Sequence, residues 1–351
     1  MVERSQLAGW RPLRFAVVGL GAFGEAYLAC LSGLRAAAGA EIAAVCSRTA
    51  SRAESLAAQY AVPRWYTDAA AVANDPEVDV VCVVTAEDEH RRPAVLALQA
   101  GKDVIVEKPL ATTLEDADAI LDAAAQSGRR LLVGHLLRSS PLYAALAARV
   151  HAGELGEIVS LHARRNRPGR LMAGYRRTHP VLETGIHDLD IMLWLAQSRV
   201  RRVRAYARTV HPGPTPDVVW GVLELESGAL GIVETIWLAP EQGGLYTDDA
   251  LAVFGSRGVA RIDLSRAPLT VTTDAGPTVV DLFYETRIEG IVGGALREQL
   301  LYFISCVREG RQPDRVPLDE ARHGLEVALA LIRSAEEDRE VVLGARNGLD
   351  A

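Results

Sequence analysis

The sequence predicts an α/β fold in which a doubly wound, mostly parallel sheet is followed by an α+β domain with an open, mostly antiparallel sheet. Two patterns carry this prediction. Short β-branched runs alternate with helical patterns up to about residue 134, which is typical of a parallel sheet. Alternating strand patterns cluster after that point. Because 351 residues exceed what one hydrophobic core usually supports, we expect two domains, 13–134 and 135–351.

Composition and charge narrow the class of function. The net charge is −7, whereas a general nucleic-acid-binding protein needs a basic face for phosphate contacts. The four cysteines form no CxxC pair, which predicts reduced core residues and no metal site; they are Cys30, Cys46, Cys82 and Cys306. Neither an apolar leader nor a run of ~18 apolar residues is present. We therefore expect a cytoplasmic protein that binds neither nucleic acid nor a membrane.

A glycine-rich turn stands where the first predicted strand meets the first predicted helix. Strand 14–18 runs into the motif Gly19-Leu20-Gly21-Ala22-Phe23-Gly24, and a helical stretch follows over 25–34. Gly19 permits the tight turn, Gly21 lets the backbone approach a pyrophosphate, and Gly24 lets helix and strand pack closely. Ala22 and Phe23, within the motif, are further candidate cofactor contacts, and the free N–H groups at the start of the helix attract an anion. The motif predicts a dinucleotide-binding site.

The end of the second predicted strand, 41–46, bears on the choice of dinucleotide. An NAD-specific site usually has Asp or Glu there for the ribose 2′-hydroxyl, whereas this chain has Ser47, Arg48 and, four residues later, Arg52. A hydroxyl and an arginine would accept a 2′-phosphate. We expect NADP(H) to be favoured over NAD(H). The alternative is that both arginines only begin a solvated helix and that NAD is also accepted.

Two buried strands of the first domain end in chemically useful residues. Strand 78–84 leads into Thr85 and, five residues on, His90. Val104-Ile105-Val106 is followed at once by Glu107-Lys108-Pro109. Ligands of open α/β sheets bind at the carboxyl ends of the strands, so Lys108 is placed to donate to a substrate oxygen and share its proton. The alternative is a surface lysine before a proline that opens the next helix.

One predicted helix of the second domain, 183–194, carries polar residues beside an apolar stripe. Glu183 and His187 are four residues apart and share a helix face, and Asp190 lies close to that face. Histidine is the natural proton-transfer group near neutral pH, and a carboxylate one turn away can orient it. The alternative is a structural histidine held by Asp190 or Glu183.

Six arginines crowd the segment before that helix, with no acid among them; they are Arg164, Arg165, Arg167, Arg170, Arg176 and Arg177. Such a cluster could hold a carboxylate or phosphate of the substrate, with Arg167, Arg170, Tyr175 and Asp190 as candidate contacts. The alternatives are an intersubunit salt-bridge patch or plain surface charge.

Taken together, the glycine motif, the Glu107-Lys108-Pro109 turn and the Glu183-x-x-x-His187-x-x-Asp190 helix resemble the Gfo/Idh/MocA oxidoreductases, the glucose–fructose oxidoreductase and inositol dehydrogenase family. The resemblance covers nearly the whole chain, about 13–343. It implies an N-terminal Rossmann domain and a C-terminal domain whose open sheet commonly forms a homodimer or homotetramer interface. It also implies hydride transfer between a nicotinamide and a carbon of a sugar or cyclitol.

The resemblance also implies roles for single residues. Lys108 would hold the reacting oxygen and assist its proton transfer, and His187 would be the general acid/base. Glu107 and Pro109 would shape the turn beside the nicotinamide, where the Lys–Pro bond can be cis. His90 matches a position near the cofactor.

One position departs from the family pattern. Glu183 stands where inositol-dehydrogenase-like members usually carry Asp, which moves the carboxylate by about one bond length. The function predicted is an NAD(P)-dependent oxidoreductase acting on a secondary alcohol or ketone of a sugar-like, possibly anionic, substrate. The alternatives are an NAD-dependent glycosidase of the same fold and a cofactor-sensing regulator; the regulator would need neither Lys108 nor His187.

Overall fold

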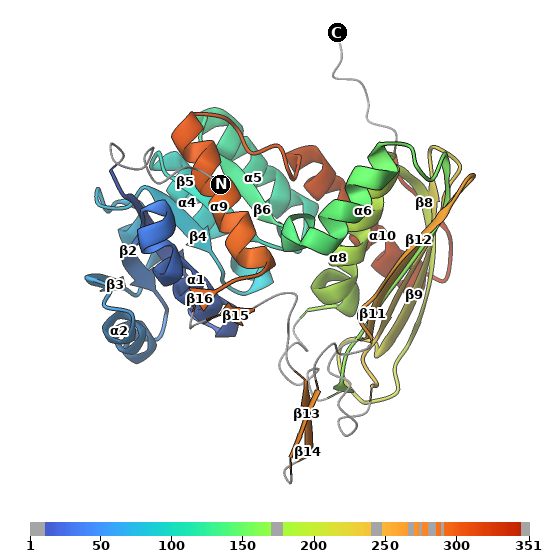
Figure 1. Cartoon of the computed structure of the whole chain (residues 1–351), viewed down its shortest axis with the longest axis horizontal. Helices are drawn as coiled ribbons and strands as arrows, with labels where there is room; N and C mark the ends of the chain where they lie inside the picture. Colours follow the sequence, from blue (N-terminus) through green and yellow to red (C-terminus); the bar gives the residue numbers. More distant parts are fainter. Residues whose placement is uncertain are drawn as a thin grey trace. The chain divides into compact units, whose positions relative to one another are not determined.

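The computed structural model describes residues 11–169, 178–239, 248–265, 270–273, 276–279, 286–288 and 291–344. The chain forms two compact units (Figure 1). The first comprises Met1–Ser140 and Phe283–Arg322, and the second Pro141–Leu282 and His323–Ala351. The sequence-based boundary at 134/135 stays a prediction; grouping by contacts places Phe283–Arg322 with the first unit rather than with the second.

The first unit is built on a six-stranded sheet of order β3-β2-β1-β4-β5-β6. All neighbouring strands are parallel. The strands are β1 (Leu13–Val18), β2 (Ala40–Cys46), β3 (Arg64–Tyr66), β4 (Val80–Val83), β5 (Asp103–Glu107) and β6 (Leu131–Gly134). The order reverses between β1 and β4, and the crevice at such a point is where open α/β sheets bind ligands.

Helices surround this sheet, so the central strands are buried. Every residue of β4 and β5 is buried, as expected for parallel strands covered on both faces. Helix α1 contacts α9, and α4 contacts both α3 and α5. The helical elements are α1 (Ala22–Ala38), α2 (Ala50–Gln59), α3 (Ala69–Ala73), η2 (Glu87–Glu89), α4 (Arg91–Gln99), α5 (Leu114–Ser127), η3 (Leu136–Ser139) and α9 (Ala295–Glu309). The short strands β15 (Arg287–Ile288) and β16 (Ile291–Val292) pair antiparallel.

The second unit is built on a seven-stranded sheet of order β12-β11-β7-β10-β9-β8-β17. Only the β10–β7 pair among these neighbours is parallel, so the predicted mostly antiparallel sheet is confirmed. The strands are β7 (Ile158–Asn166), β8 (Val200–Arg208), β9 (Val218–Leu225), β10 (Leu230–Ile236), β11 (Asp248–Gly255), β12 (Val259–Asp263) and β17 (Val341–Val342). A separate pair consists of β13 (Thr270–Thr273) and β14 (Gly276–Val279).

One face of the second sheet carries helices. Its helical elements are α6 (Pro141–His151), a π-helical turn at Val181–Gly185, α8 (Ile186–Ala196) and α10 (Leu318–Glu336), within which the division between the units falls. Helix α8 contacts β7 and β10. A Cβ on Gly221 of β9 would lie 2.7 Å from a methyl of Leu331 on α10, so the helix needs a glycine on the strand beneath it. None of the helices in the described ranges is both long and apolar enough to cross a bilayer.

Candidate functional site

The glycine-rich turn has the geometry that a pyrophosphate site requires. Gly19 has a φ of +100°, and a Cβ there would lie 2.3 Å from the carbonyl oxygen of Val84. A Cβ on Gly24 would lie 2.0 Å from the carbonyl oxygen of Gly19, so helix α1 can approach β1 only with glycine at this position. By contrast, a Cβ on Gly21 would meet nothing within 4 Å, which leaves space beside the turn for a ligand.

The start of helix α1 faces that space with backbone donors. Gly21 is the N-cap residue and has no side chain to accept from the first-turn N–H groups. Ala22 and Phe23 form the first turn, and the Phe23 side chain is exposed. Free N–H groups and the helix dipole favour an anion here. These features fit the pyrophosphate of a dinucleotide.

The two arginines near the end of β2 are engaged by carboxylates from other elements. Arg48 Nη1 donates to Glu89 Oε1 of η2 at 2.6 Å, and Arg52 Nη2 donates to Glu25 Oε2 of α1 at 2.8 Å. Arg52 Nε also donates to the Leu20 carbonyl at 3.1 Å. Ser47, the next residue after β2, accepts through Oγ from the N–H of Thr49 at 3.3 Å. Neither carboxylate could be predicted as a partner from the sequence, because they lie 41 and 27 residues from their arginines.

Thr85 and His90 follow β4, and His90 ties this segment to the turn after β5. Its side chain is buried, and Nδ1 lies 2.9 Å from the carbonyl oxygen of Pro109, so Nδ1 carries the proton and donates. Burial lowers the pKa of His90 and keeps the ring neutral. The histidine therefore holds the Lys108–Pro109 turn in place.

The Glu107-Lys108-Pro109 turn is anchored from beneath by a buried carboxylate. Glu107 accepts a 2.6 Å hydrogen bond from the Tyr27 hydroxyl and a 3.2 Å bond from the N–H of Lys108. The Lys108–Pro109 bond is cis, as the resemblance implied. A Cβ on Gly134 would lie 2.6 Å from Glu107 Oε1, so β6 leaves room for the carboxylate only because it ends in glycine.

Tyr27 and Gln299 extend this anchor and were not predicted. Gln299 Nε2 of α9 donates to the Tyr27 hydroxyl at 3.3 Å, and both side chains are buried. Burial, and after it the charge of Glu107, raise the pKa of Tyr27 well above its usual value, so the hydroxyl stays a donor. No sequence signal pairs residues 27, 107 and 299, since each lies on a different element.

Lys108 differs from most basic residues of the chain because it is a lysine and not an arginine. Lysine occurs at only two of the 38 basic positions, Lys102 and Lys108. The Lys102 ammonium donates to the carbonyl oxygens of Asp75 and Val78, each at 2.8 Å, which is a structural use. Lys108 sits at the other end of β5, after the last buried residue of the strand. A lysine can exchange a proton, whereas an arginine stays charged.

The predicted helix 183–194 begins in a different form. Val181–Gly185 is a π-helical turn, and the α-helix starts at Ile186, so the prediction of one regular helix from Glu183 is wrong. The regular one-turn spacing assumed for Glu183 and His187 therefore does not apply at this point. Glu183 and Asp190 are buried and His187 is half-buried.

A buried cluster of hydroxyls and one indole supports the π-helical turn. Thr184 Oγ1 lies 2.8 Å from Thr235 Oγ1 and donates to the Pro180 carbonyl at 2.9 Å. Trp237 Nε1 donates to Thr235 Oγ1 at 3.2 Å. Because π-helical turns occur frequently at functional sites, this support beneath Glu183 is consistent with a site at the turn.

The arginine cluster is largely internal scaffolding where the structure describes it. Arg165, 2% exposed, donates from Nη2 to Asp188 at 2.8 Å and from Nη1 to Asp249 at 2.5 Å. Arg167 Nη1 also donates to Asp249 at 2.5 Å, and Arg164 Nε donates to Asp248 at 2.8 Å. Arg167 is thus already neutralised, and its assignment to an anionic substrate stays a prediction. Arg170, Tyr175, Arg176 and Arg177 lie outside the described residues.

One of the ion pairs of Arg165 is with Asp188, the residue next to His187. Asp188 of α8 is buried and accepts from Nε and Nη2 of Arg165. Burial raises the pKa of Asp188, and the Arg165 guanidinium opposes that rise. The ion pair fixes the first turn of α8 against β7, which carries Arg165.

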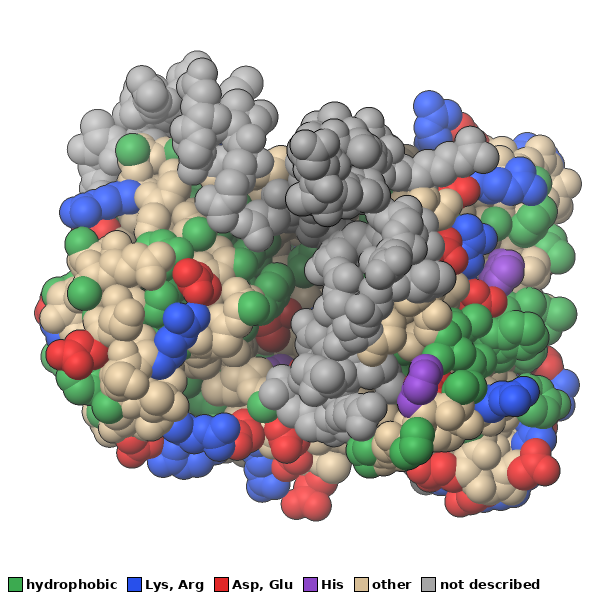
Figure 2. Space-filling view, turned by 90° about the horizontal axis from the view of Figure 1, so that it is seen from below, with side chains coloured by type: hydrophobic (Ala, Val, Ile, Leu, Met, Phe, Trp, Pro, Cys, Tyr) green, Lys and Arg blue, Asp and Glu red, His purple; other side chains and the backbone are tan. Residues whose placement is uncertain are grey.

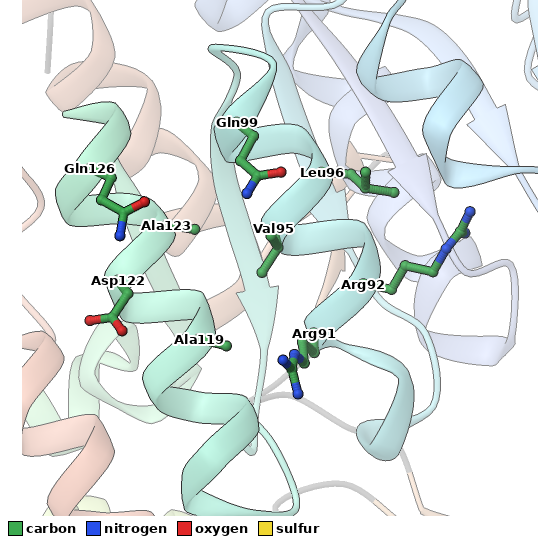
Figure 3. A pocket seen from close by; sticks show the side chains of 9 residues that line it. All are labelled: Arg91, Arg92, Val95, Leu96, Gln99, Ala119, Asp122, Ala123 and Gln126. Carbon is green, nitrogen blue, oxygen red and sulfur yellow. The ribbon is translucent and has the colours of Figure 1, made fainter.

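A surface pocket of about 430 Å³ lies elsewhere, between α4 and α5 (Figure 3). Arg91, Gln99, Asp122 and Gln126 border it, around Val95. None of the predicted site residues lines it. Within the described ranges, no group of three or more His, Cys, Asp or Glu side chains is arranged to hold a metal ion.

Comparison with known proteins gives two family matches and several relatives. Residues 13–135 match the GFO/IDH/MocA oxidoreductase family, NAD-binding Rossmann fold, and residues 143–261 match the C-terminal domain of that family. Inositol 2-dehydrogenase from Salmonella typhimurium is 30% identical over 257 residues, which are 71% of this chain and 74% of the relative. The scyllo-inositol 2-dehydrogenase (NAD(+)) from Bacillus subtilis is 28% identical over 345 residues, 95% of this chain and 97% of the relative.

A solved structure shares the whole fold. The scyllo-inositol dehydrogenase from Lactobacillus casei, determined with NAD(H) and scyllo-inositol, superposes with a TM-score of 0.80. It is 18% identical and covers 95% of this chain and 99% of its own. The predicted fold class, a parallel Rossmann sheet with a second, mostly antiparallel sheet, is confirmed.

Proposed function

Because the chain belongs to the GFO/IDH/MocA oxidoreductase family, whose first domain is an NAD-binding Rossmann fold, we propose that it is an NAD(P)-dependent dehydrogenase acting on a CH–OH group of a cyclitol or sugar. These matches confirm the resemblance to the Gfo/Idh/MocA family that the three motifs indicated. The observation that carries the proposal is the glycine turn after β1, where Gly24 permits close helix packing and Gly21 leaves space for a pyrophosphate. When bound, the nicotinamide supplies the hydride acceptor or donor.

In this proposal Lys108 holds the reacting oxygen and shares its proton. His187 is the general acid/base, with Glu183 four residues before it in the sequence. The carboxylate of Glu107 supports Lys108 from the interior by binding its N–H. His90 supports the same turn through the Pro109 carbonyl. The use of lysine at 108, in a chain that otherwise relies on arginine, supports a role in which the ammonium gives up a proton.

For the cofactor, we propose that the site favours NADP(H) over NAD(H). The end of β2 presents Ser47, Arg48 and Thr49 and no carboxylate of its own. An arginine there can bind a 2′-phosphate through two parallel hydrogen bonds. Two of the relatives named above, from Bacillus subtilis and Lactobacillus casei, carry NAD in their descriptions, so this preference would distinguish the chain from them.

For the substrate, the names of the relatives favour a cyclitol such as inositol or a related sugar. Glu183 is a carboxylate that could accept hydrogen bonds from substrate hydroxyls. An anionic substrate group stays part of the proposal, with Arg167 and Arg170 as candidate contacts; Arg170 lies outside the described residues. A cytoplasmic location remains a proposal as well.

The outer face of the second sheet supports a homo-oligomer. Tyr206, Trp220 and Leu230 are 58%, 53% and 51% exposed, and Val222 and Ile232 are 42% and 41% exposed. Tyr206 pairs directly with Trp220, and Val222 with Ile232, so these side chains share one face. Figure 2 shows hydrophobic side chains, in green, gathered at the right of the view, where the second sheet lies. We propose that a second copy of the chain covers this face.

Light scattering tests the oligomer. Trp220→Glu should convert the wild-type oligomer to a monomer, because it places a charge in an apolar interface. Trp65→Glu is the matched control, since Trp65 is 41% exposed on the first sheet. A monomeric wild type, or an oligomer that survives Trp220→Glu, would refute the proposal.

A turnover screen tests the dehydrogenase. The purified protein would meet cyclitols, aldoses, uronic acids and phosphorylated sugars, with NAD⁺ and NADP⁺ separately, and ketones with NADPH. Lys108→Arg keeps the charge, but the guanidinium cannot release a proton near neutral pH. We therefore expect kcat to fall by about 10²–10⁴. Lys102→Arg replaces the other lysine and should retain turnover. Tight dinucleotide binding with no net cofactor consumption on any substrate would refute the dehydrogenase.

A further inference from the structure

The two arginines near the end of β2 differ in how firmly they are held. Arg52 binds both the Leu20 carbonyl and the Glu25 carboxylate, and these contacts fix it against the glycine turn. Arg48 binds Glu89, and its side chain is 81% exposed. An exposed ion pair contributes only ~0.2–1 kcal/mol, so Arg48 can exchange Glu89 for a stronger partner at little cost.

The Arg48–Glu89 pair lies at the place where a dinucleotide would put its adenosine ribose. Arg48 follows β2, and Glu89 belongs to η2 after β4. Strand β1 lies between β2 and β4 and pairs with both. The pair therefore joins the segments on either side of the glycine turn that follows β1. In Rossmann domains the end of the second strand contacts the ribose 2′ position.

We propose that Glu89 sets the selectivity between NADP(H) and NAD(H) by competing with the 2′-phosphate for Arg48. This inference rests on the proposed function and adds a selectivity residue to it. A carboxylate and a phosphate are both acceptors for the same guanidinium, and Glu89 also repels the phosphate. With NAD(H), the Glu89 carboxylate can accept from the ribose hydroxyl, as an acid on β2 does in other sites.

The competition explains how a chain without an acid at the end of β2 can still bind NAD(H). The missing carboxylate comes from η2 instead, 41 residues further along the chain. Arg48 and Glu89 then form one unit with two states. The arginine is paired with Glu89 when the ribose carries a hydroxyl, and with the phosphate when it carries a phosphate.

Calorimetric titration of the full chain with NADPH and with NADH tests the proposal without needing a substrate. Glu89→Gln keeps the size of the side chain and removes its charge. We expect NADPH to bind about three- to tenfold more tightly, which corresponds to the loss of one exposed competing ion pair and its repulsion. NADH should bind with unchanged or weaker affinity. The thermal midpoint should stay within about 2 °C of wild type, because the pair is exposed.

Two further variants separate this role from a general change in charge. Glu25→Gln makes the same charge change beside Arg52, at the start of α1, so NADPH and NADH should respond alike and their affinity ratio should stay constant. Arg48→Gln should reduce NADPH binding and abolish the effect of Glu89→Gln in the double variant. Such non-additivity is expected if Glu89 and the 2′-phosphate bind the same arginine, Arg48.

The outcomes distinguish the inference from the function on which it rests. An NADPH-to-NADH affinity ratio that does not change in Glu89→Gln overturns the inference alone. So does an equal effect of Glu89→Gln with and without Arg48. Failure of the wild-type chain to bind either dinucleotide overturns the proposed function and, with it, the inference.

Discussion

Asp249→Asn removes the carboxylate at the centre of the buried arginine scaffold. Asp249 is fully buried and accepts from Nη1 of Arg165 and of Arg167, each at 2.5 Å. Arg165 is itself 2% exposed, so it cannot turn to water when its partner is lost. The amide of asparagine keeps the shape but leaves two guanidinium groups facing a neutral side chain. Arg165 would keep its ion pair with Asp188 but lose the one with Asp249.

The expected loss follows from burial. Breaking a buried ion pair by removing one partner costs ~3–5 kcal/mol, because an uncompensated charge remains in a low-dielectric interior. For a domain of ~150–250 residues each kcal/mol corresponds to about 2–4 °C, so the thermal midpoint should fall by roughly 6–20 °C. The first turn of α8 should also loosen, since Arg165 holds Asp188 there.

Asp248→Asn, the same change at the adjacent residue, is the matched control. Asp248 lies on the same strand and pairs with Arg164, but their side chains are 23% and 35% exposed. Asp248→Asn should therefore cost less than ~1 kcal/mol. Thermal unfolding followed by circular dichroism, with urea unfolding as a second measure, compares the two. If Asp249→Asn were no more destabilising than Asp248→Asn, the assignment of these arginines to a stabilising scaffold would be wrong.

Three shorter predictions concern two anchors of the site, Tyr27 and Gly24, and His179, which accepts from the N–H groups of Val181 and Glu183 in the π-helical turn. Tyr27→Phe deletes the donor to the buried Glu107, so it should destabilise the chain by ~1–3 kcal/mol and lower kcat; unchanged melting would contradict the anchor. Gly24→Ala forces a Cβ to within 2.0 Å of the Gly19 oxygen and should weaken dinucleotide titrations at least about tenfold, whereas wild-type affinity would contradict the packing argument. Burial lowers the pKa of His179 to about 4 from 6.5, so the unfolded chain binds the extra proton between these values. Stability should fall by up to ~3 kcal/mol as pH drops from 6.5 to 4, and His179→Gln should flatten that urea-unfolding profile; an equally steep profile would contradict it.

Local patterns were sufficient to predict the fold. Val104, Ile105 and Val106 gave a central parallel strand because three β-branched residues in a row suit a sheet covered on both faces. The glycine motif located the first turn, since its spacing is set by backbone conformation at Gly19 and by close packing at Gly24. Both signals depend on residues next to each other in the chain.

The supports of the candidate site could not be predicted in this way. The Tyr27–Glu107 bond joins residues 80 apart, and Gln299 reaches the same tyrosine from a helix near the other end of the chain. The π-helical turn at Val181–Gly185 escaped prediction because its residues have ordinary helical spacing, whereas Thr184 is bound to Thr235 on a distant strand. Contacts between residues so far apart in the sequence form only in the folded chain, so no local pattern indicates them.

The arginine cluster shows why charge counted along a sequence is a weak guide to a binding site. Six cations without an intervening acid suggested an anion site, yet Asp188 and Asp249 neutralise Arg165 and Arg167 from distant segments. The same reasoning applies to Arg48, whose partner Glu89 lies beyond the next strands. What distinguishes these pairs is exposure: the Arg165 pairs are buried and therefore fixed, whereas Arg48 is exposed and can exchange its partner. An exposed, exchangeable cation near the ribose position, such as Arg48, is thus a better candidate for anion recognition than a buried and already paired arginine such as Arg165.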